Sequence, residues 1–357
     1  MSKKNIIISV IVILIILFGI LGFYFHDDIQ KYLEDQPWLY TTPYAEKEIL
    51  PANNYINGYG LMTVRDNNLY VYDKKLNLEN SSNINTSSVM FRSNGIYTVI
   101  ASKEKGFIKL FIKNKEQWSK TVPFDVKGLN VNSKGYVCVV FSQNGYKSGV
   151  KVYSANGDEI SNAYLGSTYA IDADVSNDGK IVYLVEVDLN GINATSNLKL
   201  IEMSTNSSKV YQIGEDEIVT CVDIKNQNDV YIQTNKAIYL FNNQNELKKI
   251  FSFENKNIGY ASIINNSSVF IVEKSNKILR TINELDYSLE LVDEPQFIDS
   301  MKDKIAMCFE NEIWVVNDKC NVIKKVKVTN GLVDIRFIND GKTLALIHNG
   351  RIELVSI

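Results

Sequence analysis

Beyond residue 50 the chain repeats one pattern of apolar and polar segments. A short apolar run is followed by a polar turn, a second apolar run, another turn and a third apolar run. The last copy is the clearest, with apolar runs at 332–337, 343–347 and 351–355 that are separated by Asn339-Asp340-Gly341-Lys342 and by Asn349-Gly350. Asp-Gly or Asn-Gly between alternating apolar runs is the strongest short-range indication of a β-hairpin. The pattern therefore predicts strands joined by tight turns.

Seven further copies of this unit lie upstream. The turns Asn177-Asp178-Gly179-Lys180, Ser133-Lys134-Gly135 and Ser93-Asn94-Gly95 each lead into an apolar run. Weaker copies have their second strands at 60–64, 230–234, 268–272 and 305–309. The third strands are expected to begin near Leu69, Ile108, Val150, Leu198, Ala237, Ile278, Ile313 and Ile352. Their mean spacing is about 40 residues, and such a period with four strands per unit is typical of a β-propeller blade.

The two ends of the repeat region predict how the propeller closes. The last copy stops at Ile357, directly after its third strand, and the segment Glu46–Pro51 precedes the first full copy. We expect this segment to supply the missing outer strand, because it would join the ends and remove an open sheet edge. The sequence thus predicts an all-β protein, a β-propeller with eight blades. Seven blades is the alternative, since the first and sixth copies are the least regular, and a pair of β-sandwiches fits the even spacing less well.

Ahead of the repeats lies a long apolar segment. In the 20 residues from Ile6 to Phe25 only Ser9, Gly19 and Gly22 are not strongly apolar. A helix of this length spans about 30 Å, the thickness of a bilayer's hydrocarbon core. The run is longer than a signal-peptide core, and neither a small-x-small cleavage site nor a lipobox cysteine follows it. The sequence therefore predicts an uncleaved signal-anchor, a transmembrane helix in the cell membrane.

The flanks of this segment predict its orientation. Lys3 and Lys4 precede it, whereas His26-Asp27-Asp28 follows it. Because positive charge is retained on the cytoplasmic side, the N-terminus is expected inside and the repeats outside. The expected organisation is a cytoplasmic tail (1–4), a transmembrane helix (5–25), a juxtamembrane stalk (26–40) and an extracytoplasmic propeller domain (41–357).

Two of the turns carry a resemblance to a known class of repeats. Ser176-Asn177-Asp178-Gly179-Lys180 and Asn339-Asp340-Gly341-Lys342 resemble the Ser-Pro-Asp-Gly-Lys turn of TolB-type, WD40-like propeller repeats, with Asn177 and Ile338 in place of the proline. The Gly-His and Trp-Asp motifs of true WD40 repeats are absent from the sequence. The whole layout is similar to uncharacterised membrane-anchored β-propeller proteins of Gram-positive, clostridia-like bacteria. This resemblance implies a fold and a cell-envelope location, and it assigns no functional residue.

Composition narrows the classes of function. The net charge of −3 and the pI near 5.7 lack the basic footprint of nucleic-acid binding, so no nucleic-acid partner is expected. Only two histidines, His26 and His348, are present, which argues against histidine-based catalysis or a histidine metal site. No Gly-x-Ser-x-Gly elbow, phosphate-binding glycine loop or tryptophan-docking repeat occurs. The sequence predicts no catalytic residue and no cofactor. The 40 asparagines suit many tight turns, although an AT-rich genome would give the same excess.

The four cysteines could form disulfides or bind a metal ion. Cys138, Cys221 and Cys308 lie in apolar strand patterns, and Cys320 lies in a turn. No pair has metal-ligand spacing, so we expect free buried thiols. A bridge between Cys308 and Cys320 stays open at this point, because it depends on the distance between the two strands.

Closely spaced carboxylates raise a catalytic alternative. Asp172 and Asp174 lie two apart on one strand and so share a face, and Glu186 and Asp188 repeat this spacing. Such carboxylates can hold a divalent cation in a propeller's central channel, as in lactonase-like enzymes. The alternative function is therefore an extracytoplasmic metal-dependent hydrolase or lyase with its site in the channel. Pairs at this spacing also arise by chance on solvated strands, so no metal ligand is assigned. The run at 214–217 predicts an acidic loop.

Two long loops supply the candidate binding residues. The loop at 143–149 carries Tyr146 and Lys147, and the insertion at 187–197 carries Asp188, Asn190 and Asn193. Rim loops usually carry binding specificity, and a tolerated surface insertion is equally compatible. The expected function is a membrane-tethered scaffold at the cell envelope that binds another envelope or membrane protein, or a cell-wall polymer. A small-ligand sensor is a third option, and it would need a partner helix for signalling.

Overall fold

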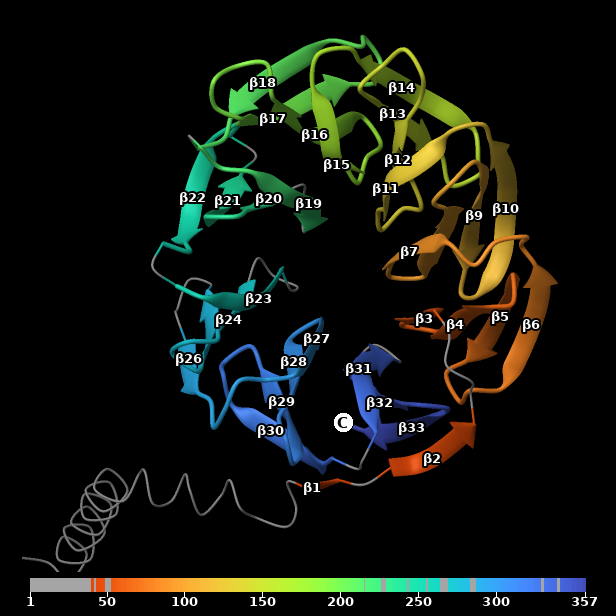
Figure 1. Cartoon of the computed structure of the whole chain (residues 1–357), viewed down its shortest axis with the longest axis vertical. Helices are drawn as coiled ribbons and strands as arrows, with labels where there is room; N and C mark the ends of the chain where they lie inside the picture. The colour runs from red at the N-terminus through yellow and green to blue at the C-terminus, as the bar shows by residue number, and fades with distance from the viewer. Residues whose placement is uncertain are drawn as a thin grey trace, which may run out of the picture.

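The computed structural model describes residues 40–41, 43–48, 53–214, 216–225, 229–242, 244–254, 256–263, 269–282, 287–328, 331–338 and 341–357. Within these ranges the chain forms eight sheets arranged around a central axis (Figure 1), which confirms the predicted eight-bladed propeller. No helix among these residues has the length and apolar character needed to cross a membrane. The predicted tail, the transmembrane helix and residues 26–39 of the stalk lie outside the described residues.

Each sheet is one blade, and its strands run outward from the axis in chain order. Blade 1 contains β3 (Asn53–Asn57), β4 (Gly60–Arg65), β5 (Asn68–Asp73) and β6 (Leu78–Asn83); blade 2 contains β7 (Val89–Asn94), β8 (Tyr97–Ser102), β9 (Gly106–Ile112) and β10 (Lys115–Val122). Blade 3 contains β11 (Asp125–Val131), β12 (Val137–Ser142), β13 (Ser148–Tyr153) and β14 (Glu159–Leu165); blade 4 contains β15 (Tyr169–Val175), β16 (Ile181–Asp188), β17 (Thr195–Glu202) and β18 (Ser208–Gln212).

The second half of the disc repeats the arrangement. Blade 5 contains β19 (Val219–Lys225), β20 (Asp229–Thr234), β21 (Ala237–Phe241) and β22 (Leu247–Ser252); blade 6 contains β23 (Ile258–Ile263), β24 (Val269–Glu273), β25 (Ile278–Ile282) and β26 (Tyr287–Glu290). Blade 7 contains β27 (Phe297–Met301), β28 (Lys304–Cys308), β29 (Glu312–Asn317) and β30 (Val322–Lys327); blade 8 contains β31 (Leu332–Ile338), β32 (Thr343–His348) and β33 (Arg351–Ser356). The eight predicted third strands coincide with β5, β9, β13, β17, β21, β25, β29 and β33.

The ends of the described chain close the disc as the sequence predicts. Strand β2 (Pro43–Glu48) pairs antiparallel with β33 as the fourth strand of blade 8, three residues ahead of the predicted segment. The short strand β1 (Tyr40–Thr41) adds to blade 7, where it pairs in parallel with β30. The pairing of β2 with β33, the last strand of the chain, removes the free edges that an open ring of blades would leave.

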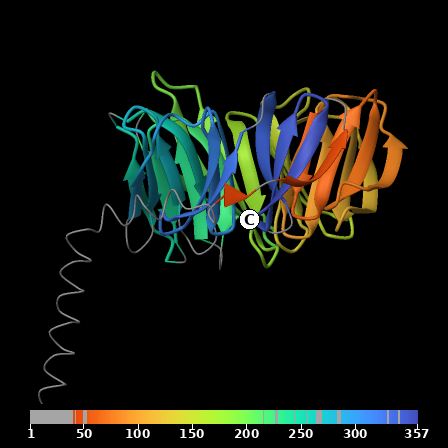
Figure 2. The same ribbon diagram turned by 90° about the horizontal axis from the view of Figure 1, so that it is seen from below.

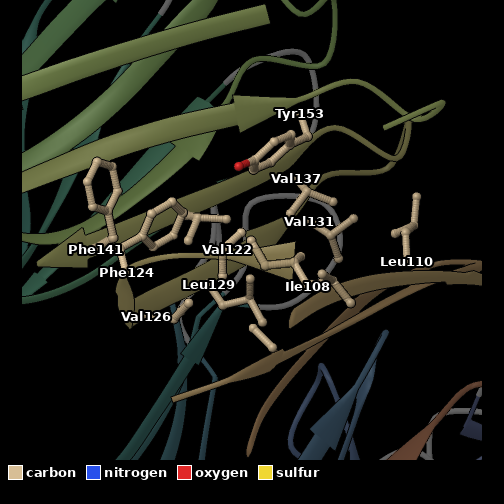
Figure 3. Close-up of a cluster of buried hydrophobic side chains, with 13 residues drawn as sticks. Ile108, Leu110, Val122, Phe124, Val126, Leu129, Val131, Val137, Phe141 and Tyr153 are labelled. Carbon is tan, nitrogen blue, oxygen red and sulfur yellow. The ribbon is translucent and has the colours of Figure 1, made fainter. Parts of the chain in front are cut away.

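The core lies between neighbouring blades. In the cluster of Figure 3, Ile108 and Leu110 of β9 pack against Val137 and Phe141 of β12 across the boundary between blades 2 and 3. The alternate residue of β12, Val140, packs on the other side against blade 4. A second strand is thus buried on both faces, which explains why these strands are continuous apolar runs rather than alternating ones. Each such side chain contributes about 1.5–3 kcal/mol on burial.

Antiparallel order places the connections on two opposite rims. The turns between first and second strands, and between third and fourth strands, form the lower rim. The loops between second and third strands, and those that lead to the next blade, form the upper rim. In the edge-on view of Figure 2, the green loop between β16 and β17 rises beyond the upper face.

Five turns of the lower rim share one local hydrogen-bonding pattern. A polar side chain at position i accepts hydrogen bonds from the backbone N–H groups at i+2 and i+4, and the residue at i+3 is left-handed. The accepting residues are Asp73, Asn132, Ser154, Asn242 and Asn317. The left-handed residues are Leu76, Gly135, Gly157, Asn245 and Cys320. The expectation that asparagine serves tight turns is confirmed, because its carboxamide can accept both bonds.

Candidate functional site

Carboxylates on the inner strands join one blade to the next. The side chain of Asp172 in β15 accepts a hydrogen bond from the backbone N–H of Val222 in β19 at 3.2 Å. Asp174 accepts in the same way from Ile224 at 3.3 Å. The arrangement recurs between β27 and β31, where Asp299 accepts from the N–H of Phe337 at 2.7 Å. These side chains therefore bridge adjacent inner strands.

Burial changes the acidity of these carboxylates. It raises the pKa of Asp172 to about 6 and that of Asp299 to about 6, and the hydrogen bonds they accept oppose this rise. The pKa of Asp174 rises to about 8, first because of burial and then because of the nearby Asp223 carboxylate. A carboxyl group in this range changes its protonation near neutral pH.

The predicted acidic pairs do not converge on one point. Glu186 in β16 accepts a hydrogen bond from Thr168 at 2.9 Å, and Asp188 accepts from the amide of Asn190 at 2.7 Å. Among the described residues, no three His, Cys, Asp or Glu side chains are grouped so that they could hold a metal ion. Asp172 and Asp174 already accept backbone hydrogen bonds, so their observed role is to connect blades.

The cysteines are free thiols. Cys138, Cys308 and Cys320 are buried, and Cys221 is half-buried, in contrast to the expected full burial. Cys308 and Cys320 form no bridge; Cys320 instead lies 3.4 Å from the hydroxyl of Thr281. Burial raises the pKa of Cys308 to about 11, so this thiol stays protonated and unreactive at neutral pH.

Exposed apolar side chains gather on the upper rim. Of the eleven large apolar side chains that are exposed in the described part of the chain, eight lie on upper-rim connections or at the strand ends beside them. These eight are Tyr146, Tyr164, Tyr169, Leu189, Ile192, Ile218, Val292 and Val333. The other three, Leu78, Ile160 and Val210, lie on the outermost strands. Five of the eight belong to blades 3 and 4, and we call these five the rim cluster: Tyr146, Tyr164, Tyr169, Leu189 and Ile192.

Three of the predicted binding residues meet beneath the rim cluster. The ammonium of Lys147 donates to the carbonyl of Ser167 at 2.9 Å and to the side-chain oxygen of Asn190 at 3.2 Å. The Asn190 amide donates to the same carbonyl at 3.0 Å and to Asp188 at 2.7 Å. These bonds connect three loops of blades 3 and 4, so Lys147, Asp188 and Asn190 hold the rim cluster in place.

Aromatic rings form the blade 3 side of the rim cluster. Tyr146 packs on Tyr164 with 4.7 Å between ring centroids, and Tyr164 meets the edge of the buried Phe141 at 5.8 Å. The Lys147 ammonium lies 5.0 Å from the centroid of Tyr169, within cation–π distance. The rings are thus fixed by contacts while one side of each stays exposed.

Sequence reasoning reached only part of this surface. It identified Tyr146 and Lys147 but missed Tyr164 and Tyr169, because these tyrosines read as ordinary strand residues of β14 and β15. Leu189 and Ile192 were detectable, since apolar residues in a loop rich in Asn and Gly have no local reason to be there. Asn193, which was also predicted as a binding residue, is exposed and is not part of the rim cluster.

The acidic run at 214–217 is more than a solvated loop. Glu217 is buried, and its carboxylate accepts hydrogen bonds from Thr234 at 2.6 Å, Tyr239 at 2.7 Å and Lys249 at 2.9 Å. Burial raises its pKa, but these three bonds outweigh that effect and hold the pKa below its ordinary value. Glu215, inside the same run, lies outside the described residues. The run is a loop between β18 and β19, as predicted, and the buried Glu217 within it anchors the start of blade 5.

Seven four-stranded blades and one blade extended by β1, closed by the pairing of β2 with β33, define the class of the protein as an eight-bladed β-propeller. Within that class the chain belongs to a family of unknown function, DUF5711, whose sequence profile matches residues 42–357. No protein with a curated description matches the chain. The propeller part of the predicted resemblance is confirmed, whereas Gram-positive origin and membrane anchoring stay predictions.

Solved structures show the same fold at low sequence identity. BamB from Moraxella catarrhalis superposes with a TM-score of 0.54 and 10% identity, covering 89% of this chain and 98% of BamB. The C-terminal WD40 domain of Sif2 superposes with a TM-score of 0.59 and 11% identity, covering 87% of this chain and 98% of that domain. Apo AztD from Citrobacter koseri superposes with a TM-score of 0.53 and 10% identity, covering 78% of this chain and 86% of AztD. At this identity the likeness establishes the propeller fold and nothing about activity.

Proposed function

We propose that this protein is a membrane-tethered, extracytoplasmic scaffold that binds another envelope protein through the rim cluster on blades 3 and 4. One observation carries the proposal: of the eleven large apolar side chains that are exposed in the described part of the chain, eight lie on the upper rim, whereas only Leu78 and Ile160 lie at strand ends beside lower-rim turns. Exposed apolar groups that collect on one face are characteristic of an interaction surface.

The chemistry of the rim cluster supports a protein partner. Tyrosines supply large contact areas with little side-chain entropy to lose, and they are enriched in the energetically dominant parts of protein interfaces. Leu189 and Ile192 add aliphatic area on the projecting loop, and Ile192 is fully exposed. The hydrogen bonds of Lys147 preorganise these loops, which lowers the entropy cost of binding.

The path of the chain supports the proposed orientation. Pro43, at the start of β2, pairs with Val355, which is near the lower end of β33. The described chain thus enters blade 8 from the side of the lower rim. With the predicted helix at residues 5–25 in the membrane, the rim cluster would face away from the bilayer and be open to a partner. We propose no enzymatic activity, because the inner-strand carboxylates bridge blades rather than converging on a shared site.

Site-directed photo-crosslinking tests the proposal. A photoreactive p-benzoylphenylalanine at Leu189 is expected to give a discrete protein adduct in intact cells. The same residue at Asn156, an exposed position in a lower-rim turn, is expected to give none. Adding Ile192→Asp to the Leu189 probe should abolish the adduct, whereas Val210→Asp on the outer strand of blade 4 should leave it unchanged.

The outcomes separate the alternatives. Equal crosslinking from Leu189 and Asn156, or an adduct that survives Ile192→Asp, would contradict binding by the rim cluster. An adduct that is released by cell-wall hydrolase rather than by protease would replace the protein partner with a wall polymer. Accessibility of a cysteine introduced at Asn156 to a membrane-impermeant thiol reagent tests the extracytoplasmic location separately.

A further inference from the structure

A groove on the outer wall between blades 2 and 3 is a separate feature from the rim cluster. Its volume is about 320 Å³, at the lower end of the range for small-molecule sites. One wall comes from the end of β10 and the connection that follows it, and the other comes from β13 and β14. The lining residues are Lys120, Thr121, Val122, Pro123, Phe124, Lys151, Tyr153 and Glu159.

Two of the charged groups in the groove, Lys151 and Glu159, form an ion pair with each other. The ammonium of Lys151 lies 2.9 and 2.8 Å from the two carboxylate oxygens of Glu159. Asn162 also donates to Glu159 at 3.0 Å. An equivalent pair, Lys109 and Glu116 at 2.9 Å, connects the third and fourth strands of blade 2. The Lys151–Glu159 pair is therefore part of the repeated blade architecture.

Two hydrogen-bond donors remain available. Lys120 forms no ion pair with any described residue, and it is half-buried at the groove. Tyr153 is only 4% exposed, and within the described ranges its phenol oxygen has no hydrogen-bond partner. In Figure 3 this oxygen points to the side on which Val122 and Phe124 lie. Burial, with smaller effects from Glu159 and Tyr164, raises the pKa of Tyr153 to about 12, so the phenol remains a donor at neutral pH.

The rest of the groove consists of Thr121 and Pro123, which are exposed, and of apolar side chains beneath them. Val122 and Phe124 are buried, and Phe124 packs on Phe141 with 4.4 Å between ring centroids. The lining has one net positive charge, since Lys120 and Lys151 oppose the single carboxylate of Glu159. A ligand that fits this lining must bring acceptor atoms and a negative charge at one end, and a flat apolar part at the other.

We propose that this groove binds a small organic carboxylate that carries a flat apolar ring. The carboxylate accepts hydrogen bonds from the Lys120 ammonium and the Tyr153 phenol, and the ring lies against the exposed Pro123, above Phe124 and Val122. A charge-assisted hydrogen bond to an ammonium is stronger than a neutral one, which makes Lys120 the main source of selectivity for an anion.

The test uses benzoate as the probe and benzamide, its neutral isostere, as the control ligand. The full chain in a nonionic detergent is labelled with 5-fluorotryptophan, and each titration is followed by fluorine NMR. Trp118 is the reporter, because its ring lies 5.9 Å from that of Tyr153, and Trp118→Phe assigns its signal. Benzoate is expected to move the Trp118 signal saturably, whereas benzamide at the same concentration leaves it in place.

Matched variants locate the interaction. Lys120→Met should weaken benzoate binding about tenfold, the loss that corresponds to one charge-assisted hydrogen bond. Tyr153→Phe should weaken it to a similar degree, and its melting temperature shows whether the fold is retained. Lys127→Met, which removes an exposed lysine outside the groove, should change nothing. Equal responses to benzoate and benzamide, no saturable response, or full affinity in Lys120→Met would overturn the proposal.

Discussion

On the lower rim, short turns close on themselves through a polar side chain that accepts two backbone hydrogen bonds, as Asn132 does at 2.9 and 3.0 Å. On the upper rim, loops of different lengths are held by side chains from other parts of the chain, as Lys147 and Asn190 hold the carbonyl of Ser167. The lower rim presents polar turn residues, and the upper rim presents the exposed tyrosines and aliphatic side chains.

The difference shows how a repeat protein separates folding from recognition. In the five lower-rim turns that show this pattern, hydrogen bonds within four residues fix the backbone irrespective of neighbouring blades, so these turns can set the register of their hairpins. Upper loops, free of that requirement, can vary in length and composition from blade to blade. Specific binding therefore falls to the rim whose structure depends on tertiary contacts.

The largest effect is expected where a lower-rim turn also bridges two blades. Asn132 is buried, and besides accepting its two turn bonds it donates to the carbonyls of Val175 and Ser176 at 3.1 and 3.0 Å. Asn132→Ala should lower the free energy of unfolding by about 3 kcal/mol, measured by urea denaturation, because the partners stay buried without bonds. Asn242→Ala, which removes the same turn bonds without a blade bridge, should cost about 1 kcal/mol. Equal losses of unfolding free energy in the two variants would mean that the hydrogen bonds between blades add nothing to stability.

A matched pair of glycines compares the rims directly. Gly135 on the lower rim has φ +84°, and a Cβ there would lie 2.6 Å from the ring of Tyr97. Gly145 on the upper rim has φ +94° and no atom within 4 Å of a Cβ. Gly135→Ala should destabilise by about 2 kcal/mol, and Gly145→Ala by about 1 kcal/mol, since only the first adds a clash to the backbone strain. Thermal unfolding of both variants would reveal whether the lower rim is the more tightly packed.

Between the rims, Asp174 tests a bridge that no local rule predicts. Its pKa of about 8 exceeds the ordinary value of 3.8, so the folded state holds more protons than the unfolded state across that interval. Its contribution to stability is complete at low pH and is lost as the pH rises from about 4 to 8. Asp174→Asn should make the unfolding free energy less dependent on pH over this interval, by up to about 1.4 kcal/mol per pH unit.

Asp172 supplies the control for this pH dependence. Because its pKa is about 6, Asp172→Asn should flatten the curve only up to that pH. Urea denaturation from pH 4 to pH 8 distinguishes the two variants. An unchanged curve for Asp174→Asn would show that this carboxyl titrates normally, and hence that the inner-strand bridge is open to solvent.

The smallest effect on stability is expected on the upper rim. Lys147→Met breaks the bonds to Ser167 and Asn190 but keeps the aliphatic stem, so the unfolding free energy should fall by about 0.5 kcal/mol. Hydrogen exchange in the loop 189–194 should nevertheless become faster, because the loop loses its brace. Lys127→Met is the control: Lys127 is exposed, and its ammonium lies 3.6 Å from the Asp125 carboxylate. This variant should change neither the free energy of unfolding nor the exchange rate of the loop. Unchanged exchange in Lys147→Met would show that the loop holds its shape without this lysine.

What the sequence determined by itself is the part of the structure that local interactions encode. The eight third strands, the closing outer strand and the lower-rim turns were predictable, because hairpin signals such as Asn339-Asp340-Gly341-Lys342 act over four or five residues. Two residues of that turn lie outside the described ranges, yet β31 and β32 on either side of it pair antiparallel, as a hairpin requires. The loops that carry Tyr146, Lys147, Asp188 and Asn190 were predictable as loops.

Only the tertiary structure decided which side chains meet. Asp174 could read as a channel ligand, and it is a bridge because the packing of blade 5 beside blade 4 places the N–H of Ile224 next to it, 50 residues away. Glu217 read as part of an acidic loop, and its side chain is buried because Thr234, Tyr239 and Lys249 converge on it from three strands. The rim cluster likewise depends on blades 3 and 4 lying side by side. Contacts of this kind leave no periodic trace in the sequence, since their partners are set by how the blades pack rather than by distance along the chain.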